Sequence, residues 1–309
     1  MKIFYGFDHL SSIRNPVVTT GSFDGVHIGH KVILNRLKKL ALEIDGETVL
    51  ITFHPHPRKV LYPETVGKDL FLINSQREKI SLLQKAGLDN LIIVEFTLAF
   101  SKISSLEFVQ NILLDKLHAR KIVIGFNHHF GHNREGDYDA LRKLGKQYGF
   151  EVEEIAEQDI QNESVSSTKI RKALMEGNIQ KANAYLDHQY IITGITEKSS
   201  STLEEIGFPS YSVKIEEDCK LIPPNGVYAV TVTGEDCFSR AMCFVRKNMQ
   251  DPINTEVEVH LFENFGKIEG QVVTLLFHKQ MREERVLTTQ EDLKKQLTID
   301  KNQVDELIF

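Results

Sequence analysis

The 309-residue sequence contains little cysteine, and this bounds the class of protein. Its three cysteines, Cys219, Cys237 and Cys243, form no Cys-x-x-Cys pair. Because a disulfide framework needs several cysteines and an oxidising compartment, we expect free thiols and a cytoplasmic protein. No apolar run approaches the roughly 20 residues that cross a bilayer. The first residues also lack the apolar segment of a secretory signal, so we expect no membrane association.

The sequence also lacks an excess of basic residues. The formal net charge is −6, and there is no long block of lysine and arginine. Since nucleic-acid surfaces are usually strongly basic, we expect no nucleic-acid partner, and a polyanion should bind only at a focused site. Hydrophobic residues make up 41% and charged residues 26% of the chain, which is typical of a globular protein with a buried core. The length suits two domains.

Residues 1–186 alternate short apolar runs with helical patterns. The runs are rich in Val, Ile, Thr and Phe and predict strands at 16–23, 47–53, 90–96, 121–126 and 151–157. Apolar residues at helical spacing predict helices at 31–44, 76–87, 105–117 and 137–149, and Ser104 and Glu107 have the spacing of a capping box. Continuous apolar strands between amphipathic helices indicate a parallel sheet covered on both faces. We predict an α/β doubly wound domain.

Residues 187–309 have a different period. Short alternating strands are predicted at 190–197, 211–217, 226–234, 241–247, 256–264 and 271–279, with a Pro-Pro-Asn-Gly turn at 223–226. Residues 288–307 read as a helix, with Thr288 and Glu291 at capping-box spacing. The pattern predicts a second domain, an antiparallel β-barrel or sandwich followed by a C-terminal helix, joined to the first near residue 187.

The segment TTGSFDGVHIGH, residues 19–30, lies between the first strand and helix of this reading. Ligands of open α/β sheets bind beyond the carboxyl ends of the strands, and a helix N-terminus there favours anions. Glycines at 21, 25 and 29 permit sharp turns and close approach of a ligand. We therefore predict a phosphate site, in which His27 and His30 donate hydrogen bonds rather than act as acid or base.

His-x-Gly-His after a first strand is the signature of the nucleotidyltransferase superfamily. The whole sequence resembles the bifunctional riboflavin kinase/FMN adenylyltransferases, the prokaryotic FAD synthetases. Three further segments resemble family motifs in the expected order: FHPHP at 53–57, GFNHHFG at 125–131 and VSSTKIRKAL at 165–174. The family pattern GxFDGxHxGH is met by Gly21, Phe23, Asp24, Gly25, His27, Gly29 and His30.

The resemblance implies that the N-terminal domain is an FMN adenylyltransferase, which converts FMN and ATP into FAD and pyrophosphate. It implies ATP binding by the seven residues of that pattern together with Ser167, Thr168 and Arg171, with His27, His30 and Arg171 as catalytic residues. It implies flavin binding by His56, Pro57, Arg58 and Asn127. Magnesium is expected as the bridging cation. A strand-end asparagine such as Asn127 is also a common turn residue.

The C-terminal domain resembles the riboflavin kinase module, which makes FMN and ADP from riboflavin and ATP. This resemblance implies that Glu258 is the catalytic base and that Ser210 and Ser212 are magnesium ligands. The sequence around Glu258 fits an outward-facing residue of an alternating strand equally well. The segment departs from the family: Ser210 and Ser212 replace Thr and Asn, and Tyr211 replaces Ala. The preceding loop, 197–205, contains no glycine to admit phosphates. These departures predict weak or absent kinase activity, with the barrel kept as a structural or flavin-holding partner.

Other interpretations remain open at this point. A zinc site is one, because seven histidines fall in the predicted loops: His27, His30, His54, His56, His128, His129 and His132. No cysteine joins them, and the spacings rarely suit tetrahedral ligation. A second alternative is an adenylyltransferase for another phosphorylated cofactor precursor, such as pantetheine phosphate or nicotinamide mononucleotide. A third is a non-catalytic flavin-binding regulator.

Overall fold

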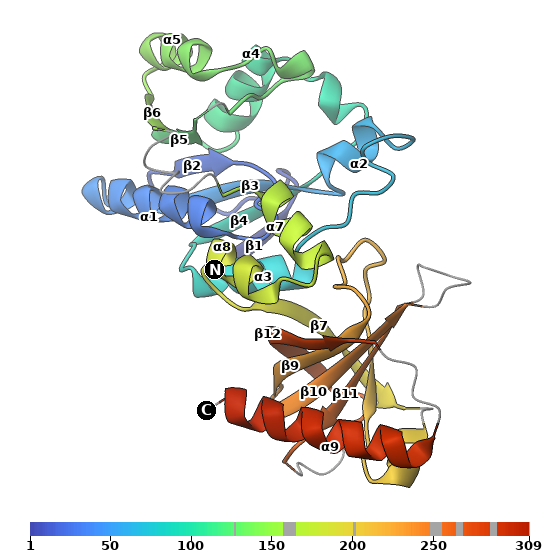
Figure 1. The fold of residues 1–309 in the computed structure, drawn as a ribbon. Helices are drawn as coiled ribbons and strands as arrows, with labels where there is room; N and C mark the ends of the chain where they lie inside the picture. Colours follow the sequence, from blue (N-terminus) through green and yellow to red (C-terminus); the bar gives the residue numbers. More distant parts are fainter. Residues whose placement is uncertain are drawn as a thin grey trace. The chain divides into compact units, whose positions relative to one another are not determined.

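The structure is a computed structural model that describes residues 1–126, 128–156, 165–199, 202–235, 237–247, 255–263, 268–284 and 289–308. The chain forms two compact units (Figure 1). The first unit contains Met1–Leu70 and Lys79–Ser166, and the second contains Phe71–Glu78 and Ser167–Phe309. Within the described residues, no helix combines the length and apolar character needed to cross a membrane.

The first unit contains a six-stranded parallel sheet in the order β1-β4-β3-β2-β5-β6. Its strands are β1 (Lys2–Tyr5), β2 (Val17–Thr20), β3 (Thr48–His54), β4 (Asn90–Glu95), β5 (Lys121–Gly125) and β6 (Glu151–Ile155). The five predicted strands and their parallel arrangement are confirmed. The edge strand β1 was not predicted, because its four residues include only a short apolar pattern.

Helices cover both faces of this sheet, as predicted (Figure 1). The helical elements between β1 and β6 are α1 (Ile28–Glu43), α2 (Pro57–Leu61), α3 (Gln76–Lys85), α4 (Ser105–Glu107) and α5 (Tyr138–Tyr148), with η1 (Phe100–Lys102), η2 (Phe108–Leu114) and η3 (His132–Arg134). One core packs apolar residues of η2 and α5 against the sheet, and the other packs those of α1, with Leu83 of α3, against the opposite face. Burial of these apolar stripes is the main stabilising contribution.

The predicted capping box at Ser104 is present. The Ser104 hydroxyl accepts a hydrogen bond from the Glu107 backbone N–H (3.2 Å), and the Glu107 carboxylate accepts one from the Ser104 N–H (2.9 Å). Each side chain thus satisfies a donor that the first turn leaves without a helical partner. The helix then changes to π-helical hydrogen bonding at Phe108, which the periodicity did not predict.

The second unit contains a closed antiparallel barrel in the order β10-β11-β8-β7-β12-β9. Its strands are β7 (Tyr190–Lys198), β8 (Tyr211–Lys214), β9 (Gly226–Thr233), β10 (Phe238–Lys247), β11 (Thr255–Leu261) and β12 (Val272–Glu283). The barrel is therefore the correct alternative to a sandwich. Large side chains such as Tyr190, Tyr228 and Phe277 are fully buried.

Helix α9 (Gln290–Leu307) lies along the barrel, and an apolar cluster joins its Leu297 and Val304 to Met242 and Phe244 of β10 (Figure 1). The C-terminal helix is confirmed, but its cap was assigned to the wrong residue. Thr289, not Thr288, caps α9, and its hydroxyl accepts from the Asp292 backbone N–H (3.1 Å). Thr288 itself lies outside the described residues.

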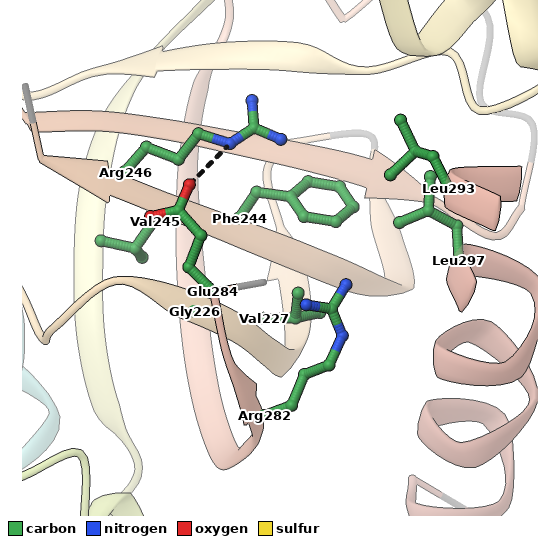
Figure 2. Close-up of a pocket in the computed structure, with 9 residues that line it drawn as sticks. All are labelled: Gly226, Val227, Phe244, Val245, Arg246, Arg282, Glu284, Leu293 and Leu297. Carbon is green, nitrogen blue, oxygen red and sulfur yellow. Dashed lines mark ion pairs between the residues drawn. The ribbon is translucent and has the colours of Figure 1, made fainter. Parts of the chain in front are cut away.

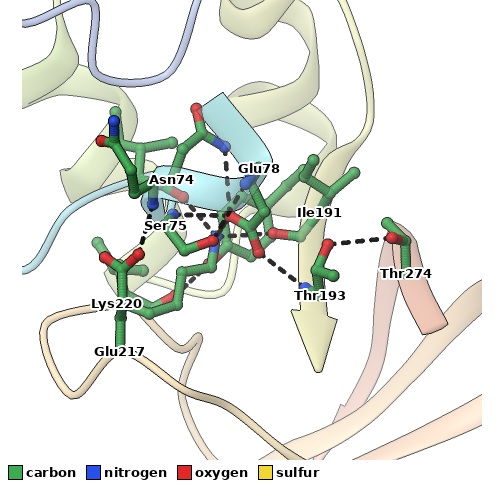
Figure 3. Close-up of polar contacts among 12 residues, drawn as sticks. Asn74, Ser75, Glu78, Ile191, Thr193, Glu217, Lys220 and Thr274 are labelled. Carbon is green, nitrogen blue, oxygen red and sulfur yellow. Dashed lines mark hydrogen bonds and ion pairs between the residues drawn. The ribbon is translucent and has the colours of Figure 1, made fainter. Parts of the chain in front are cut away.

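The second unit also includes α7 (Ser167–Met175), α8 (Ile179–Leu186), the short η4 (Thr202–Ile206) and the segment Phe71–Glu78. A buried ion pair attaches this segment to the barrel: Lys220 Nζ lies 2.7 Å from Glu78 Oε2, and neither side chain is exposed (Figure 3). The Lys220 ammonium also donates to the Ile191 carbonyl (2.7 Å), and the Thr193 N–H donates to Glu78 Oε1 (2.7 Å). Such pairing compensates the cost of burying two charges.

Candidate active sites

The segment from Gly21 to His30 connects β2 to α1 at the carboxyl edge of the parallel sheet. Phe23, Gly25 and Val26 have positive φ angles of 47°, 94° and 41°. Residues other than glycine rarely adopt this backbone conformation, so the surrounding packing must hold the loop in place. Gly25 has the positive φ angle of a sharp turn, for which the sequence predicted a glycine. Gly29, by contrast, lies inside α1 and has no positive φ angle.

His27 and His30 lie together at the N-terminus of α1. Their rings are stacked with centroids 3.7 Å apart, and the Phe23 ring stacks on His30 at 4.5 Å. His27 is the N-cap residue, but its side chain makes no capping hydrogen bond, and the first turn of α1 contains no acidic residue. The positive end of the helix dipole is therefore not neutralised by a carboxylate of that turn, which suits an anion.

The environment keeps His30 uncharged. Burial lowers the pKa of its imidazole well below the usual value, and the nearby His27 and Lys79 act in the same direction. A neutral imidazole donates a hydrogen bond from one ring nitrogen only. The His30 Nδ1 atom is buried and has no hydrogen-bond partner among the described residues. A neutral ring can donate a hydrogen bond to phosphate, and the role of His30 in phosphate binding stays a prediction.

The FHPHP segment ends β3 and begins α2. His56 is the N-cap of α2, and its Nδ1 accepts a hydrogen bond from the Arg58 backbone N–H (3.2 Å). Pro57 is the first residue of this helix, and the Arg58 side chain is exposed. The structure thus brings the three predicted flavin contacts together and gives His56 a local structural role as well.

Three half-buried phenylalanines lie together at this edge and were missed by the sequence reasoning. Phe53 is the next-to-last residue of β3, Phe96 follows β4 and Phe100 begins η1, and their ring centroids lie 5.5 to 5.9 Å apart. The available signal was that two of these three phenylalanines, Phe53 and Phe96, are the last residues of predicted strands. Aromatic faces suit the binding of a flat ring system.

The GFNHHFG segment follows β5. The predicted flavin contact Asn127 lies outside the described residues. Burial lowers the pKa of His128 to about 4, with smaller effects from His129 and Arg134, so this ring is neutral near pH 7. Its Nε2 atom is buried and has no hydrogen-bond partner in the part of the chain that the structure describes. His128 also stacks on Phe130 with centroids 6.4 Å apart.

The SSTKIR segment forms the start of α7, in the second unit. Ser167, Thr168 and Arg171 share this helix, and Arg171 Nε donates to the Phe71 carbonyl (2.8 Å). This contact uses one edge of the guanidinium group. The loop from Gly21 to His30 belongs to the first unit.

Glu258 lies in β11 on the face of the barrel that also carries Phe244. It is 6% exposed, and the Ser199 and Ser210 hydroxyls both donate to its Oε1 atom, from Ser210 over 2.6 Å. Ser212 is its cross-strand neighbour in β8. The structure therefore brings together Glu258, Ser210 and Ser212 as the sequence predicted, and it adds Ser199.

Arg246 is a further neighbour of Glu258. Its Nη1 atom lies 3.7 Å from Glu258 Oε2, and its Nε lies 3.8 Å from Glu284 Oε1. Arg246 and Phe244 line a cavity of about 50 Å³, together with other residues that include Arg282, Leu293 and Leu297 (Figure 2). Sites for drug-sized ligands usually measure roughly 300–1,000 Å³. The described side chains thus leave little space there.

The described residues include no group of three or more His, Cys, Asp and Glu side chains placed to hold a metal ion. They therefore offer no support for the zinc interpretation. Magnesium needs fewer protein ligands when substrate phosphates supply the others. The oxygens of Ser210 and Glu258 have suitable chemistry, but the guanidinium of Arg246 beside Glu258 opposes a cation there.

A doubly wound α/β unit with a His-x-Gly-His loop, and a six-stranded barrel with an adjacent carboxylate, define a two-part nucleotide-dependent transferase. Comparison with known families agrees with this class. The FAD synthetase family matches residues 10–169, and the riboflavin kinase family matches residues 186–308. The chain belongs to the family of bifunctional riboflavin kinase/FMN adenylyltransferases.

Curated proteins of this name are similar along nearly their whole length. One from Buchnera aphidicola is 31% identical over 97% of this chain and 96% of the relative. One from Listeria monocytogenes is 32% identical over 93% and 90%, and one from Escherichia coli is 28% identical over 97% and 96%. The crystal structure of a macrolide-efflux protein from Streptococcus pneumoniae superposes with a TM-score of 0.86 at 24% identity, covering 98% of both chains. This last likeness shows the fold alone.

Proposed function

We propose that this protein makes FAD by transferring AMP from ATP to FMN, with release of pyrophosphate. The observation that carries the proposal is the stacked pair His27 and His30 at the N-terminus of α1, on the carboxyl edge of the sheet. The pair lies in a loop that matches the FAD synthetase family. A site of this kind binds polyphosphate through neutral donors and backbone N–H groups.

The reaction requires positioning more than covalent chemistry. The FMN phosphate oxygen attacks the α-phosphorus of ATP, and the bond to the pyrophosphate oxygen breaks. The His27 imidazole and the neutral imidazole of His30 donate hydrogen bonds to phosphate oxygens on which charge increases. Arg171, with a planar fork of donors, and the hydroxyls of Ser167 and Thr168 bind further phosphate oxygens. When bound with ATP, magnesium neutralises phosphate charge.

The flavin binds through aromatic and polar residues at the ends of β3, β4 and β5. The ring faces of Phe53, Phe96 and Phe100 offer a surface for the isoalloxazine. His56, Pro57 and Arg58, together with Asn127, bind the remaining parts of FMN. Residues 1–186 form the adenylyltransferase domain in this proposal, and residues 187–309 form the riboflavin kinase domain.

The kinase domain converts riboflavin and ATP into FMN and ADP. The FMN is the substrate of the adenylyl-transfer reaction. Glu258 takes the proton from the ribityl hydroxyl, and Ser210 and Ser212 are the residues whose oxygens would hold a magnesium ion brought with ATP. The serine substitutions and the Arg246 contact predict that this reaction is slow. We also infer a cytoplasmic location and small-molecule partners only, in keeping with three free cysteines.

The test is to offer the purified protein FMN with ATP and magnesium, and to separate the products by chromatography. FAD should form in step with pyrophosphate. Parallel reactions with pantetheine phosphate or nicotinamide mononucleotide should release no pyrophosphate. Release with either of these, and not with FMN, would make the protein an adenylyltransferase of another substrate. Bound flavin without any pyrophosphate release would make it a flavin-binding regulator.

A further inference from the structure

A buried amine contacts the loop between β2 and α1. Lys79 belongs to the first unit and is only 8% exposed. Its Nζ atom donates to the Ser22 carbonyl (3.3 Å) and to Thr52 Oγ1 (3.4 Å). The Thr52 hydroxyl donates to the same Ser22 carbonyl (3.2 Å). Thus α3 and the end of β3 both hold one backbone oxygen of the loop.

The Ser22 carbonyl oxygen lies next to a residue with an unfavourable backbone conformation. Ser22 directly precedes Phe23, the first of the loop residues with a positive φ angle. The conformation is unfavourable for a phenylalanine and persists only where the surroundings determine it. The Phe23 ring in turn stacks on His30. Hydrogen bonds that fix the Ser22 carbonyl therefore also help to place the His30 ring.

Lys79 also contributes charge. The His30 imidazole is neutral, so it donates a hydrogen bond to a phosphate without adding a full positive charge. The lowered pKa of His30 results in part from the charge of Lys79, which indicates that this charge is felt at the ring. A buried charge is poorly screened by solvent, and its effect on a nearby polyphosphate is correspondingly larger than at the surface.

We propose that Lys79 is a positioning residue of the adenylyl-transfer site. Its ammonium group fixes the Ser22 carbonyl, and with it the loop that carries His27 and His30, while adding a fixed positive charge on the ATP side of the reaction. The proposal rests on the proposed formation of FAD. It differs from a purely structural role because it predicts a defect in the use of ATP and not of FMN.

The experiment compares Lys79→Met, Lys79→Arg and Thr52→Val with wild-type protein in steady-state FAD formation. Lys85→Met is the matched control, because Lys85 is an exposed lysine of the same helix. For Lys79→Met, kcat/KM for ATP should fall by about 100-fold, the order of loss that small misplacements in a site cause. KM for FMN should stay within about twofold of wild type. Lys79→Arg should recover at least about tenfold of the loss, because it keeps a buried cationic donor.

Thr52→Val removes the second hydrogen bond to Ser22 and should lower kcat/KM for ATP by about fivefold. Lys85→Met should behave like wild type. Thermal unfolding of each variant, followed by circular dichroism, shows whether it is folded. A wild-type protein that makes no FAD would refute the proposed function and not the role of Lys79.

Three results would overturn the role of Lys79 in an active wild-type background. One is a folded Lys79→Met variant with kcat/KM for ATP within twofold of wild type. Another is a lower kcat for Lys79→Met, with KM for ATP and KM for FMN both unchanged and with no recovery in Lys79→Arg. A preparation in which part of the enzyme is misfolded would give this result. The third result applies if Lys79→Met does not fold. It is a kcat/KM for ATP equal to that of wild type in both Lys79→Arg and Thr52→Val.

Discussion

The rings of His27 and His30 are stacked almost parallel, with an angle of 19° between their planes and centroids 3.7 Å apart. Two imidazolium cations would repel each other at this separation. The stacking is therefore consistent with the lowered pKa of His30, and it favours a neutral His30 ring near pH 7. It suits hydrogen-bond donation to phosphate and does not require proton transfer.

Replacing His30 by alanine should remove a phosphate contact made in the transition state. Losing one such donor typically costs about 3 kcal/mol, so FAD formation should slow on the order of 100-fold. The melting temperature should change little. The exposed His9 provides the control, and His9→Ala should keep the wild-type rate. Wild-type turnover by His30→Ala would refute the phosphate role.

Arg171→Lys should slow FAD formation although it preserves the charge. An ammonium group cannot reproduce two parallel donors, and the contact from Arg171 Nε to the Phe71 carbonyl would also be lost. We expect a loss on the order of tenfold or more in kcat/KM for ATP. Lys172→Met is the control on the same helix, because Lys172 is exposed and pairs with Glu176. An unchanged rate in Arg171→Lys would place Arg171 away from the phosphates.

Conversion of riboflavin to FMN should be much slower than conversion of FMN to FAD. Ser199, Ser210 and Arg246 already engage the Glu258 carboxylate, which leaves it less available as a base. Glu258→Gln should abolish the remaining kinase reaction and leave FAD formation from FMN intact. Glu256→Gln is the control, since Glu256 is exposed on the same strand. Comparable rates for the two reactions of the wild-type protein, followed by chromatography, would show that the kinase is fully active.

Breaking the ion pair between Glu78 and Lys220 should destabilise the second unit (Figure 3). Lys220→Met leaves the Glu78 carboxylate buried without its cation, and removing one member of a buried pair typically costs about 3–5 kcal/mol in the free energy of unfolding. The double variant Glu78→Gln with Lys220→Met should recover part of this loss. Lys214→Met, at an exposed pair with Glu197, should change stability by less than about 0.5 kcal/mol. Urea unfolding followed by circular dichroism measures the stability of the wild-type protein and of these three variants.

Stability should fall as the pH is lowered from 6.5 towards 4, in part because of His128. The pKa of His128 is about 4 in the folded protein and about 6.5 in the unfolded chain, so the unfolded chain binds the proton first. At pH 5 this difference costs about 2 kcal/mol relative to pH 7.5. In His128→Phe, which keeps an aromatic ring next to Phe130, the pH-dependent loss in urea unfolding should be smaller by that amount. An identical pH dependence would contradict the shifted pKa.

The sequence determined those features that depend on neighbours along the chain. Apolar periodicity predicted the strands of the barrel and, except for β1, those of the parallel sheet, because each residue's face follows from its position in the repeat. The spacing in TTGSFDGVHIGH predicted the loop site, since the strand, the turn and the helix N-terminus lie within about a dozen residues of one another. The capping box at Ser104 was predicted for the same reason.

Tertiary structure alone decided the contacts between distant segments. Nothing near Lys79 in the sequence indicates that its amine reaches Ser22, and nothing near Glu78 indicates that it pairs with Lys220. Arg246 became a neighbour of Glu258 through the register between β10 and β11. Such pairings depend on the packing of whole elements and on the burial of charge, and a local pattern carries no information about either.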